Sequence, residues 1–319
     1  MTDHRYPPTS EAAGAVARAD IVLPGAATGV SVPLTCRWPA GRAAKAHVVF
    51  CHGLGASGRD YAGLSMHWAA HGYLVVHPTF PDWVGAVTAA EPDLGVDPAG
   101  DLDGWAADSR LRPRMHEILH SPSYWLERVC IVRRVLDERD AIFAATCGKP
   151  SRPLLGAVAG HSFGAYTSQL FAGAEIDLPG EGARSFRDDR FAAAILLSAQ
   201  GRDQQGLRRG SWDDISGPML NVTGTRDGGA RGQDWHWKVE PYEFAPPGDK
   251  YLAVLTDADH YLGGIARPTQ SHMPAQQAAV EELTLAFLDA FLTDDAAAKS
   301  WLAGITDRIG DCPLVFRRK

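Results

Sequence analysis

Residues 154–165, Leu-Leu-Gly-Ala-Val-Ala-Gly-His-Ser-Phe-Gly-Ala, decide the fold of this chain. The apolar run over residues 154–159 is typical of a strand buried on both faces, and residues 165–172 have the composition of a helix. Between them, Gly-His-Ser-Phe-Gly fits the pattern G-x-S-x-G. The turn from strand to helix at such a motif is so tight that side chains two positions either side of the serine would clash. The serine, Ser162, is therefore predicted to stand exposed at the end of a strand, in a strained backbone conformation.

The alternation of strand and helix continues on both sides of this motif. Most of the apolar runs are continuous rather than alternating, which favours strands of a mostly parallel central sheet with helices on both faces, an α/β fold. The predicted strands cover residues 32–38, 47–51, 72–77, 154–159, 192–198, 219–223 and 251–255. The first run contains Pro33 and Arg37 and is predicted to be an edge strand.

Two helices are predicted from the spacing of apolar residues. In the first, Ser121 is a candidate N-cap and Pro122 takes the first helical position. Its apolar face is expected to pack in the core, as is that of a second helix near the C-terminus. The two stripes are Trp125, Val129, Val132 and Leu136 in the first helix, and Val280, Leu283, Phe287, Leu288 and Phe291 in the second.

The chain of 319 residues is expected to form one domain over residues 20–319, preceded by a flexible N-terminal arm over residues 1–19. An irregular stretch at about residues 81–120 is a candidate lid or binding loop, because long irregular loops in compact domains often serve binding. It carries Trp83 and Trp105, which we take as candidate residues of a substrate pocket.

Composition excludes several classes of protein. Hydrophobic residues make up 45% and charged residues 22%, which is ordinary for a globular chain. The net charge of −7 and the lack of a basic run argue against binding to nucleic acid or to an anionic membrane. The first residues contain no apolar segment and no later stretch is apolar enough for a transmembrane span, so the expectation is a soluble, cytoplasmic protein.

Neither a metal nor another cofactor is expected. The five cysteines contain no C-x-x-C pair and are odd in number, which indicates reduced thiols rather than a disulfide framework or a zinc site. Residues 101–104 match only part of a calcium loop and lack its distal glutamate, so a solvated acidic loop is the better interpretation.

A second motif, residues 52–55 (His-Gly-Leu-Gly), directly follows a predicted strand. In folds with the G-x-S-x-G turn, this position supplies one backbone N–H of an oxyanion hole, and the residue after the serine supplies the other. We therefore assign the N–H groups of Leu54 and Phe163 as the two donors. Taken alone the loop would be an ordinary glycine-rich turn.

The order of residues along the chain then indicates an acid and a base. A serine needs an adjacent base to become a nucleophile, and the base needs a carboxylate to orient it. Asp227 follows the strand at 219–223 and His260 follows the strand at 251–255, which is the order Ser, acid, His expected for this arrangement. Asp257 and Asp259 are nearer to His260 in sequence, but they are expected to hydrogen-bond the local backbone, as aspartates do in turns.

These segments resemble one branch of a known superfamily. Residues 52–61 and 69–73, the serine turn at 160–165, residues 198–201 and residues 247–260 are similar to the platelet-activating-factor acetylhydrolase and dienelactone-hydrolase-like branch of the α/β-hydrolases. The resemblance covers roughly residues 32–291. It implies the α/β-hydrolase fold, a Ser162–His260–Asp227 triad with an oxyanion hole at Leu54 and Phe163, and hydrolysis of a small-molecule ester without a cofactor. The chain departs from the pattern at Ala165, where many relatives have glycine, and at residues 79–83.

Two other functions remain open at this point. An amidase or peptidase would use the same triad, and a non-catalytic binding protein could share the fold, since a fold does not fix a function. Haloalkane and epoxide hydrolysis are disfavoured, because enzymes of those kinds resemble this fold with an acid at the position of Ser162.

Overall fold

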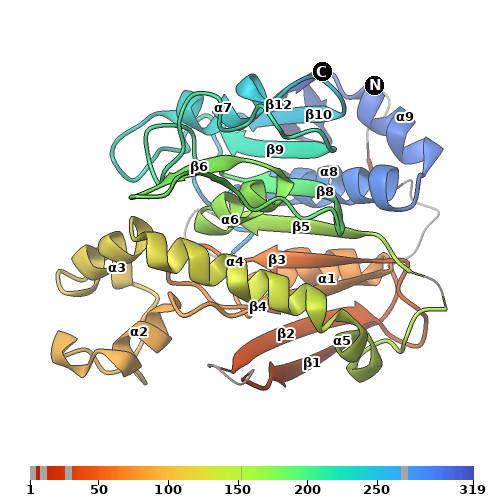
Figure 1. Cartoon of the computed structure of the whole chain (residues 1–319). Helices are drawn as coiled ribbons and strands as arrows, with labels where there is room; N and C mark the ends of the chain where they lie inside the picture. The colour runs from red at the N-terminus through yellow and green to blue at the C-terminus, as the bar shows by residue number, and fades with distance from the viewer. Residues whose placement is uncertain (1–4, 8–12, 26–30, 152, 267–271) are drawn as a thin grey trace.

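The computed structural model describes residues 5–7, 13–25, 31–151, 153–266 and 272–319. Within these residues, ten strands form one sheet in the order β1-β2-β4-β3-β5-β8-β9-β10-β12-β11 (Figure 1). The strands of this sheet are β1 (Val16–Leu23), β2 (Val32–Pro39), β3 (Ala46–Cys51), β4 (Tyr73–Pro78), β5 (Gly156–His161), β8 (Phe191–Leu197), β9 (Met219–Gly224), β10 (Lys250–Leu255), β11 (Arg308–Ile309) and β12 (Cys312–Arg318).

The centre of the sheet is parallel, as the sequence predicts. The neighbouring pairs β4–β3, β3–β5, β5–β8, β8–β9 and β9–β10 all run in the same direction, whereas β1, β2 and β12 pair antiparallel at the two sides. Each predicted strand is present, with ends shifted by one or two residues. One expectation is wrong: β2 is not an edge strand, because β1 pairs along its whole length with Val22 opposite Pro33.

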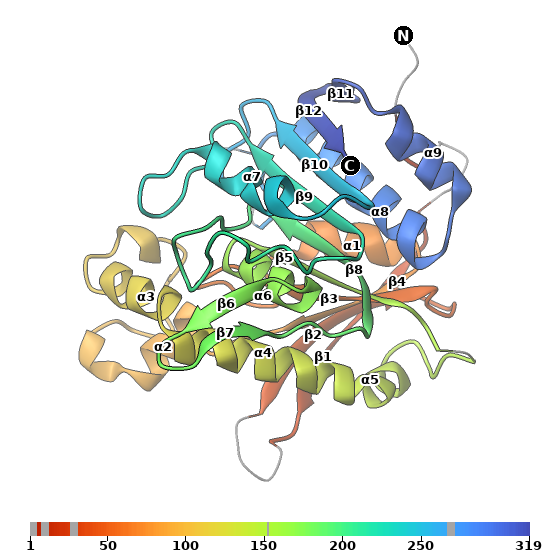
Figure 2. The ribbon, with the colours of Figure 1, turned by 45° about the horizontal axis from the view of Figure 1, so that its top comes forward.

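Helices cover both faces of the sheet. Alternate residues of β5 and β10 point into separate cores, which is why residues 157–159 and 251–255 are apolar without a break. Figures 1 and 2 show α4 and α8 on opposite sides of the sheet, and the predicted apolar stripes of both are buried or partly buried there. The helices are α1 (Ala62–Ala70), α2 (Val84–Ala90), α3 (Leu111–Leu119), α4 (Pro122–Asp137), α5 (Arg139–Ala145), α6 (Phe163–Ala172), α7 (Trp235–Phe244), α8 (Pro274–Leu292) and α9 (Ala296–Gly304).

The start of α4 differs from prediction in one detail. Ser121 is its N-cap residue and Pro122 its first residue, but the Ser121 side chain makes no capping hydrogen bond. Its Oγ lies 2.8 Å from Ser123 Oγ instead. The proline still fits the first turn, where an N–H has no helical partner to lose.

Two parts of the predicted N-terminal arm belong to the folded domain, which corrects the expectation of a flexible arm. Strand β1 begins at Val16, so the end of the arm is part of the sheet. Tyr6 is buried, and its hydroxyl donates to Asp289 Oδ2 of α8 over 2.7 Å. Residues 1–4 and 8–12 of the predicted arm lie outside the described residues. The sequence shows no strong apolar run here, because β1 is half exposed and alternates between polar and apolar side chains.

The stretch over residues 81–120 is not irregular throughout. It contains α2, α3 and two 3₁₀ turns, η1 (Pro92–Leu94) and η2 (Trp105–Ala107). In Figure 1, α2 and α3 lie beyond the ends of the strands, at the edge toward which the arrows of β3 and β5 point. This segment therefore lies over the edge of the sheet where loops after parallel strands gather.

The sequence did not predict the hairpin of β6 (Glu175–Leu178) and β7 (Gly182–Ser185), which lies beside α6 (Figure 2).

No helix in the described part of the chain is both long enough and apolar enough to span a bilayer.

Candidate active site

Ser162 occupies the tight turn between β5 and α6. Its φ of 54° and ψ of −121° lie in a region that side-chain-bearing residues rarely adopt. The turn presses α6 against the end of β3: a Cβ added at Gly164 would come within 1.8 Å of the Cys51 carbonyl oxygen. Only glycine permits this approach, and the result is a serine raised at the carboxyl edge of the sheet.

Three side chains from separate loops form a hydrogen-bonded chain at this edge. Ser162 Oγ lies 3.0 Å from His260 Nε2, and His260 Nδ1 lies 2.9 Å from Asp227 Oδ1. Because the carboxylate can only accept, Nδ1 carries the proton and Nε2 is left to accept from the serine hydroxyl. The strands β5, β9 and β10 bring these residues together, since each residue follows the carboxyl end of its strand.

Asp227 is fully buried and remains charged through its partners. Burial alone raises the pKa of its carboxyl group, but the Lys238 ammonium and the hydrogen bond from His260 lower that pKa overall. Thr223 Oγ1 donates to Oδ2 over 2.8 Å, and Ser198 Oγ lies 2.9 Å from His260 Nδ1. A buried, ionised carboxylate can thus hold the imidazole ring in one orientation.

Lys238 is a residue that sequence reasoning missed. It comes from α7, is 2% exposed, and its Nζ lies 3.9 Å from Asp227 Oδ1 and donates to the Ser198 carbonyl oxygen over 3.3 Å. Burial lowers the pKa of this ammonium, while the Asp227 charge opposes that shift. The neighbouring His236 is exposed on α7 and stacks on Trp235.

The other two aspartates of the region have partners other than the imidazole. Asp259 Oδ1 accepts a hydrogen bond from the Tyr261 backbone N–H over 2.9 Å. Asp257 forms an exposed ion pair with Arg226, also at 2.9 Å. Asp259 thus bonds to local backbone, as expected, whereas Asp257 pairs with a side chain.

The loop after β3 lies beside the serine, since a Cβ added at Gly53 would come within 3.4 Å of Ser162 Cβ. Within the described residues, neither the Leu54 N–H nor the Phe163 N–H donates a hydrogen bond. Leu54 lines the cavity above Ser162, and Phe163 begins α6. Backbone N–H groups without partners are the groups from which oxyanion holes are built.

A buried ion pair supports this loop from below. Arg128 Nε donates to Asp82 Oδ1 over 3.0 Å, and the same guanidinium donates to the His52 carbonyl oxygen over 2.9 Å. His52 Nδ1–H donates to the Gly53 carbonyl oxygen, and its Nε2 accepts from the Phe80 N–H. Burial lowers the His52 pKa to about 4, so the ring is neutral and both nitrogens keep these roles. His52 therefore braces the loop.

His161, inside the serine turn, connects this loop to His260. The Tyr61 hydroxyl accepts from the Gly53 N–H over 3.0 Å and donates to His161 Nδ1 over 2.9 Å. His161 Nε2–H then donates to the His260 carbonyl oxygen over 2.7 Å. Burial, and next the neighbouring His260, lower the His161 pKa to about 3, which keeps the ring neutral.

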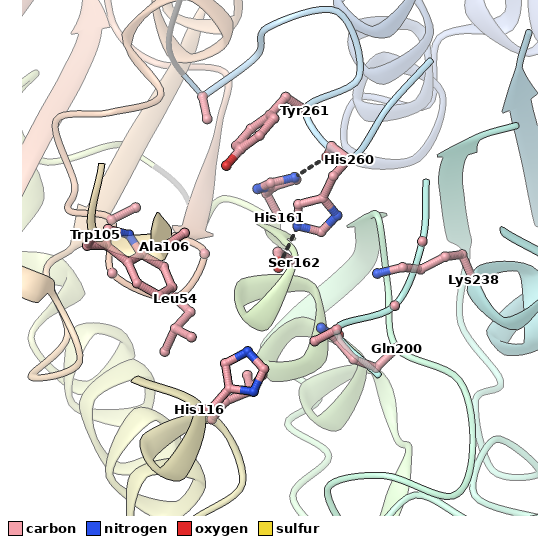
Figure 3. A pocket seen from close by; sticks show the side chains of 18 of the residues that line it. Leu54, Trp105, Ala106, His116, His161, Ser162, Gln200, Lys238, His260 and Tyr261 are labelled. Atoms are coloured by element: carbon pink, nitrogen blue, oxygen red, sulfur yellow. Dashed lines mark hydrogen bonds between the residues drawn. The ribbon is translucent and has the colours of Figure 1, made fainter. Parts of the chain in front are cut away.

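A cavity of about 870 Å³ opens over these residues, within the range of small-molecule sites. Figure 3 shows Leu54, Trp105 and Ala106 on one side of Ser162, with Gln200 and Lys238 on the other. Trp105 lies against the loop at Gly55, where an added Cβ would meet the indole Nε1 at 2.6 Å.

Trp83, the other candidate pocket residue, is not among the described residues that line this cavity. It is 38% exposed, and its ring lies against Gly85 in the first turn of α2. Trp237, by contrast, lines the cavity, and nothing in the sequence distinguishes it from the other tryptophans. Among the residues that the structure describes, no group of His, Cys, Asp and Glu side chains is arranged to hold a metal ion.

Comparisons with known proteins support the fold. No protein-family model matches the chain, and no curated protein matches it. Solved structures do match, 692 chains in number. One is a cold-adapted esterase from an Arctic intertidal metagenomic library, solved as a PEG-bound complex; its TM-score is 0.55 at 17% identity, over 87% of this chain and 94% of that one. With its mostly parallel sheet and helices on both faces, this chain has the α/β-hydrolase fold.

Proposed function

We propose that this protein is a serine hydrolase that cleaves carboxylic esters through an acyl-enzyme intermediate. The observation that carries the proposal is the hydrogen-bonded chain from Asp227 through His260 to Ser162, with the serine in a strained turn beneath a cavity. Such a chain lets the imidazole accept the serine proton, and perturbed, buried partners of this kind are typical of functional sites.

The reaction has two halves. Ser162 Oγ attacks the ester carbonyl while its proton passes to His260 Nε2, and the oxyanion accepts hydrogen bonds from the N–H groups of Leu54 and Phe163. His260 then protonates the departing alcohol, and an acyl group stays on the serine. Water, deprotonated by the same imidazole, attacks the acyl group and releases the acid, and the proton returns to Ser162. Asp227 stays ionised throughout and stabilises the imidazolium.

Within the fold, we propose the platelet-activating-factor acetylhydrolase and dienelactone-hydrolase-like branch. The support is the combination of the His-Gly-Leu-Gly loop at residues 52–55 with the turn at residues 160–165. The segment at residues 81–120 would be the binding segment, because Trp105, His116 and Leu119 line the cavity.

The test is covalent labelling combined with turnover. A fluorophosphonate probe should label the wild-type chain at Ser162, and the protein should hydrolyse p-nitrophenyl esters of graded acyl length faster than the matching anilides. Ser162→Ala should lose both, with kcat reduced on the order of 10⁶-fold, while its thermal unfolding stays close to that of the wild type. A folded Ser162→Ala protein that retains more than a few per cent of activity would refute the proposal.

A further inference from the structure

One wall of the cavity is built from the loop that follows β8. We call residues 198–207 the glutamine loop, because Gln200, Gln204 and Gln205 all line the cavity. The opposite wall is apolar and contains Leu54, Trp105 and Ala106 (Figure 3). The cavity is therefore divided into an amide-bearing side and an apolar side.

The side chains of Gln200 and Gln204 have unmet hydrogen-bonding capacity. Each residue is only 6% exposed, and Gln200 Oε1 and Gln204 Nε2 are buried with no hydrogen-bond partner in the described part of the chain. Gln205 has one partner, the Leu119 carbonyl oxygen at 3.1 Å, and its Oε1 has none there. Because buried polar atoms without partners are costly and uncommon, one such atom on each of three amides around one cavity indicates a ligand that supplies partners to this wall.

The glutamine loop is held in position by hydrogen bonds to several helices. Tyr166 of α6 donates to the Gln205 carbonyl oxygen over 2.8 Å, and Trp237 of α7 donates to the Arg202 carbonyl oxygen over 2.9 Å. Ser198, Asp203 and Gln205 have φ values of 56°, 67° and 53°, in the left-handed region that non-glycine residues seldom adopt. Strain of this kind persists only where the surroundings fix the backbone, so the amides are presented in a set arrangement.

The charges around the cavity do not favour an anionic ligand. Lys238 is balanced by Asp227 at 3.9 Å, and the lining contains no arginine among the described residues. Asp60 and Asp103 add carboxylates to the lining. A long acyl chain is also a poor ligand for the glutamine loop, since it would cover the amides without offering them hydrogen bonds.

We propose that the glutamine loop binds an uncharged, hydroxyl-bearing group of the ester, a sugar or other polyol. Its hydroxyls would donate to and accept from the amides of Gln200 and Gln204, which can do both. Its C–H face would lie against Leu54 and Trp105, which offer apolar surface. This inference rests on the proposed ester hydrolysis and adds the substrate class.

The experiment compares two acetates of similar size: a methyl glucopyranoside acetylated at its primary hydroxyl, and cyclohexylmethyl acetate, which lacks the ring hydroxyls. The wild type should prefer the sugar ester in kcat/KM by tenfold or more. Gln200→Met and Gln204→Met, made separately, should each reduce that preference by about tenfold, which corresponds to one lost hydrogen bond. Gln277→Met is the matched control: this α8 glutamine bonds to Glu281 outside the cavity, and its preference should equal that of the wild type.

A binding measurement separates this inference from the proposed function. Calorimetric titration of the sugar ester into Ser162→Ala should give a dissociation constant that Gln204→Met, added to that background, weakens by about tenfold. Equal preference for the two acetates, or an affinity that Gln204→Met leaves unchanged, would overturn the polyol subsite. Sugar-ester binding that depends on Gln204, together with a wild type that is neither labelled nor able to turn over any ester, would retain the subsite and refute the hydrolase.

Discussion

His161 Nε2 lies 2.7 Å from the backbone carbonyl oxygen of His260 and fixes the loop that carries the candidate base. The contact is made from within the serine turn itself, because His161 precedes Ser162. The same ring accepts from Tyr61, whose hydroxyl also accepts from the Gly53 N–H. One chain of hydrogen bonds therefore sets the relative position of the oxyanion loop, the serine turn and the histidine loop.

This relation predicts the effect of removing the Tyr61 hydroxyl. Tyr61→Phe leaves two buried groups, the Gly53 N–H and His161 Nδ1, without a hydrogen-bond partner. The peptide that precedes the Leu54 donor is then no longer held in position. We expect kcat for ester hydrolysis to fall by about tenfold, a change of about 1.4 kcal/mol in the barrier, with a smaller change in KM. Steady-state kinetics on a p-nitrophenyl ester measure both constants.

Tyr73→Phe is the matched control for that variant. The Tyr73 hydroxyl is also buried and donates to Asp289 Oδ1 over 2.6 Å, on the α8 side of the sheet. Its loss should lower thermal stability and leave kcat near the wild-type value. If both phenylalanine variants lose kcat equally, Tyr61 has a general structural role and no positioning role.

The acid of the site can be identified by comparing two aspartates. Asp227→Asn should lower kcat by up to about 10⁴-fold, because the amide favours the wrong imidazole tautomer. Asp259→Asn should reduce kcat by less than about tenfold, since the Asp259 carboxylate accepts from the local Tyr261 N–H. Rates at alkaline pH, on variants whose folding is checked by circular dichroism, decide the ranking. The reverse order would assign the acid to the histidine loop.

The two tryptophans of the segment at residues 81–120 should behave differently. Trp105 lines the cavity against Gly55, whereas Trp83 lies against α2. Trp105→Ala should therefore change the relative kcat/KM values across a series of acyl lengths by several-fold, on the scale of about 1 kcal/mol for altered apolar contact. Trp83→Ala should leave the order and spacing of those values unchanged. A shift in selectivity with Trp83→Ala, and none with Trp105→Ala, would contradict the cavity geometry.

Buried neutral histidines predict a loss of stability in acid. Burial holds the His47 and His52 pKa values at about 4 and that of His161 at about 3, while His77 is lowered as well. An unfolded chain protonates each of these rings near pH 6.5, so between about pH 6.5 and 4 the unfolded state binds more protons. The free energy of unfolding should then fall with falling pH, by about 1.4 kcal/mol per pH unit for each such ring.

Urea unfolding at pH 5, 6 and 7 measures this slope. His77→Leu should reduce the slope by about one proton, since neither ring nitrogen of His77 has a hydrogen-bond partner in the described part of the chain. His236→Leu is the control, because His236 is exposed. Identical slopes for wild type and His77→Leu would mean that this ring is charged in the folded protein.

What the sequence determined by itself is local in character. The continuous apolar runs predict the central strands, because a strand covered on both faces must be apolar at every position. Gly160 and Gly164 predict the tight turn that raises Ser162, and the order of residues along the chain indicates Asp227 and His260. β1 was not predicted, because it is half exposed and its alternating polar and apolar residues give only a weak signal for a strand.

What only the tertiary structure decided are contacts between residues far apart in sequence. Arg128 is 1% exposed and pairs with Asp82, 46 positions away. Lys238 reaches Asp227 because α7 packs over β9 and β10. The periodicity of a sequence does not predict such pairs, because the two residues are brought together only by folding. A buried charge loses its hydration, and the partner supplied by the tertiary structure offsets that cost.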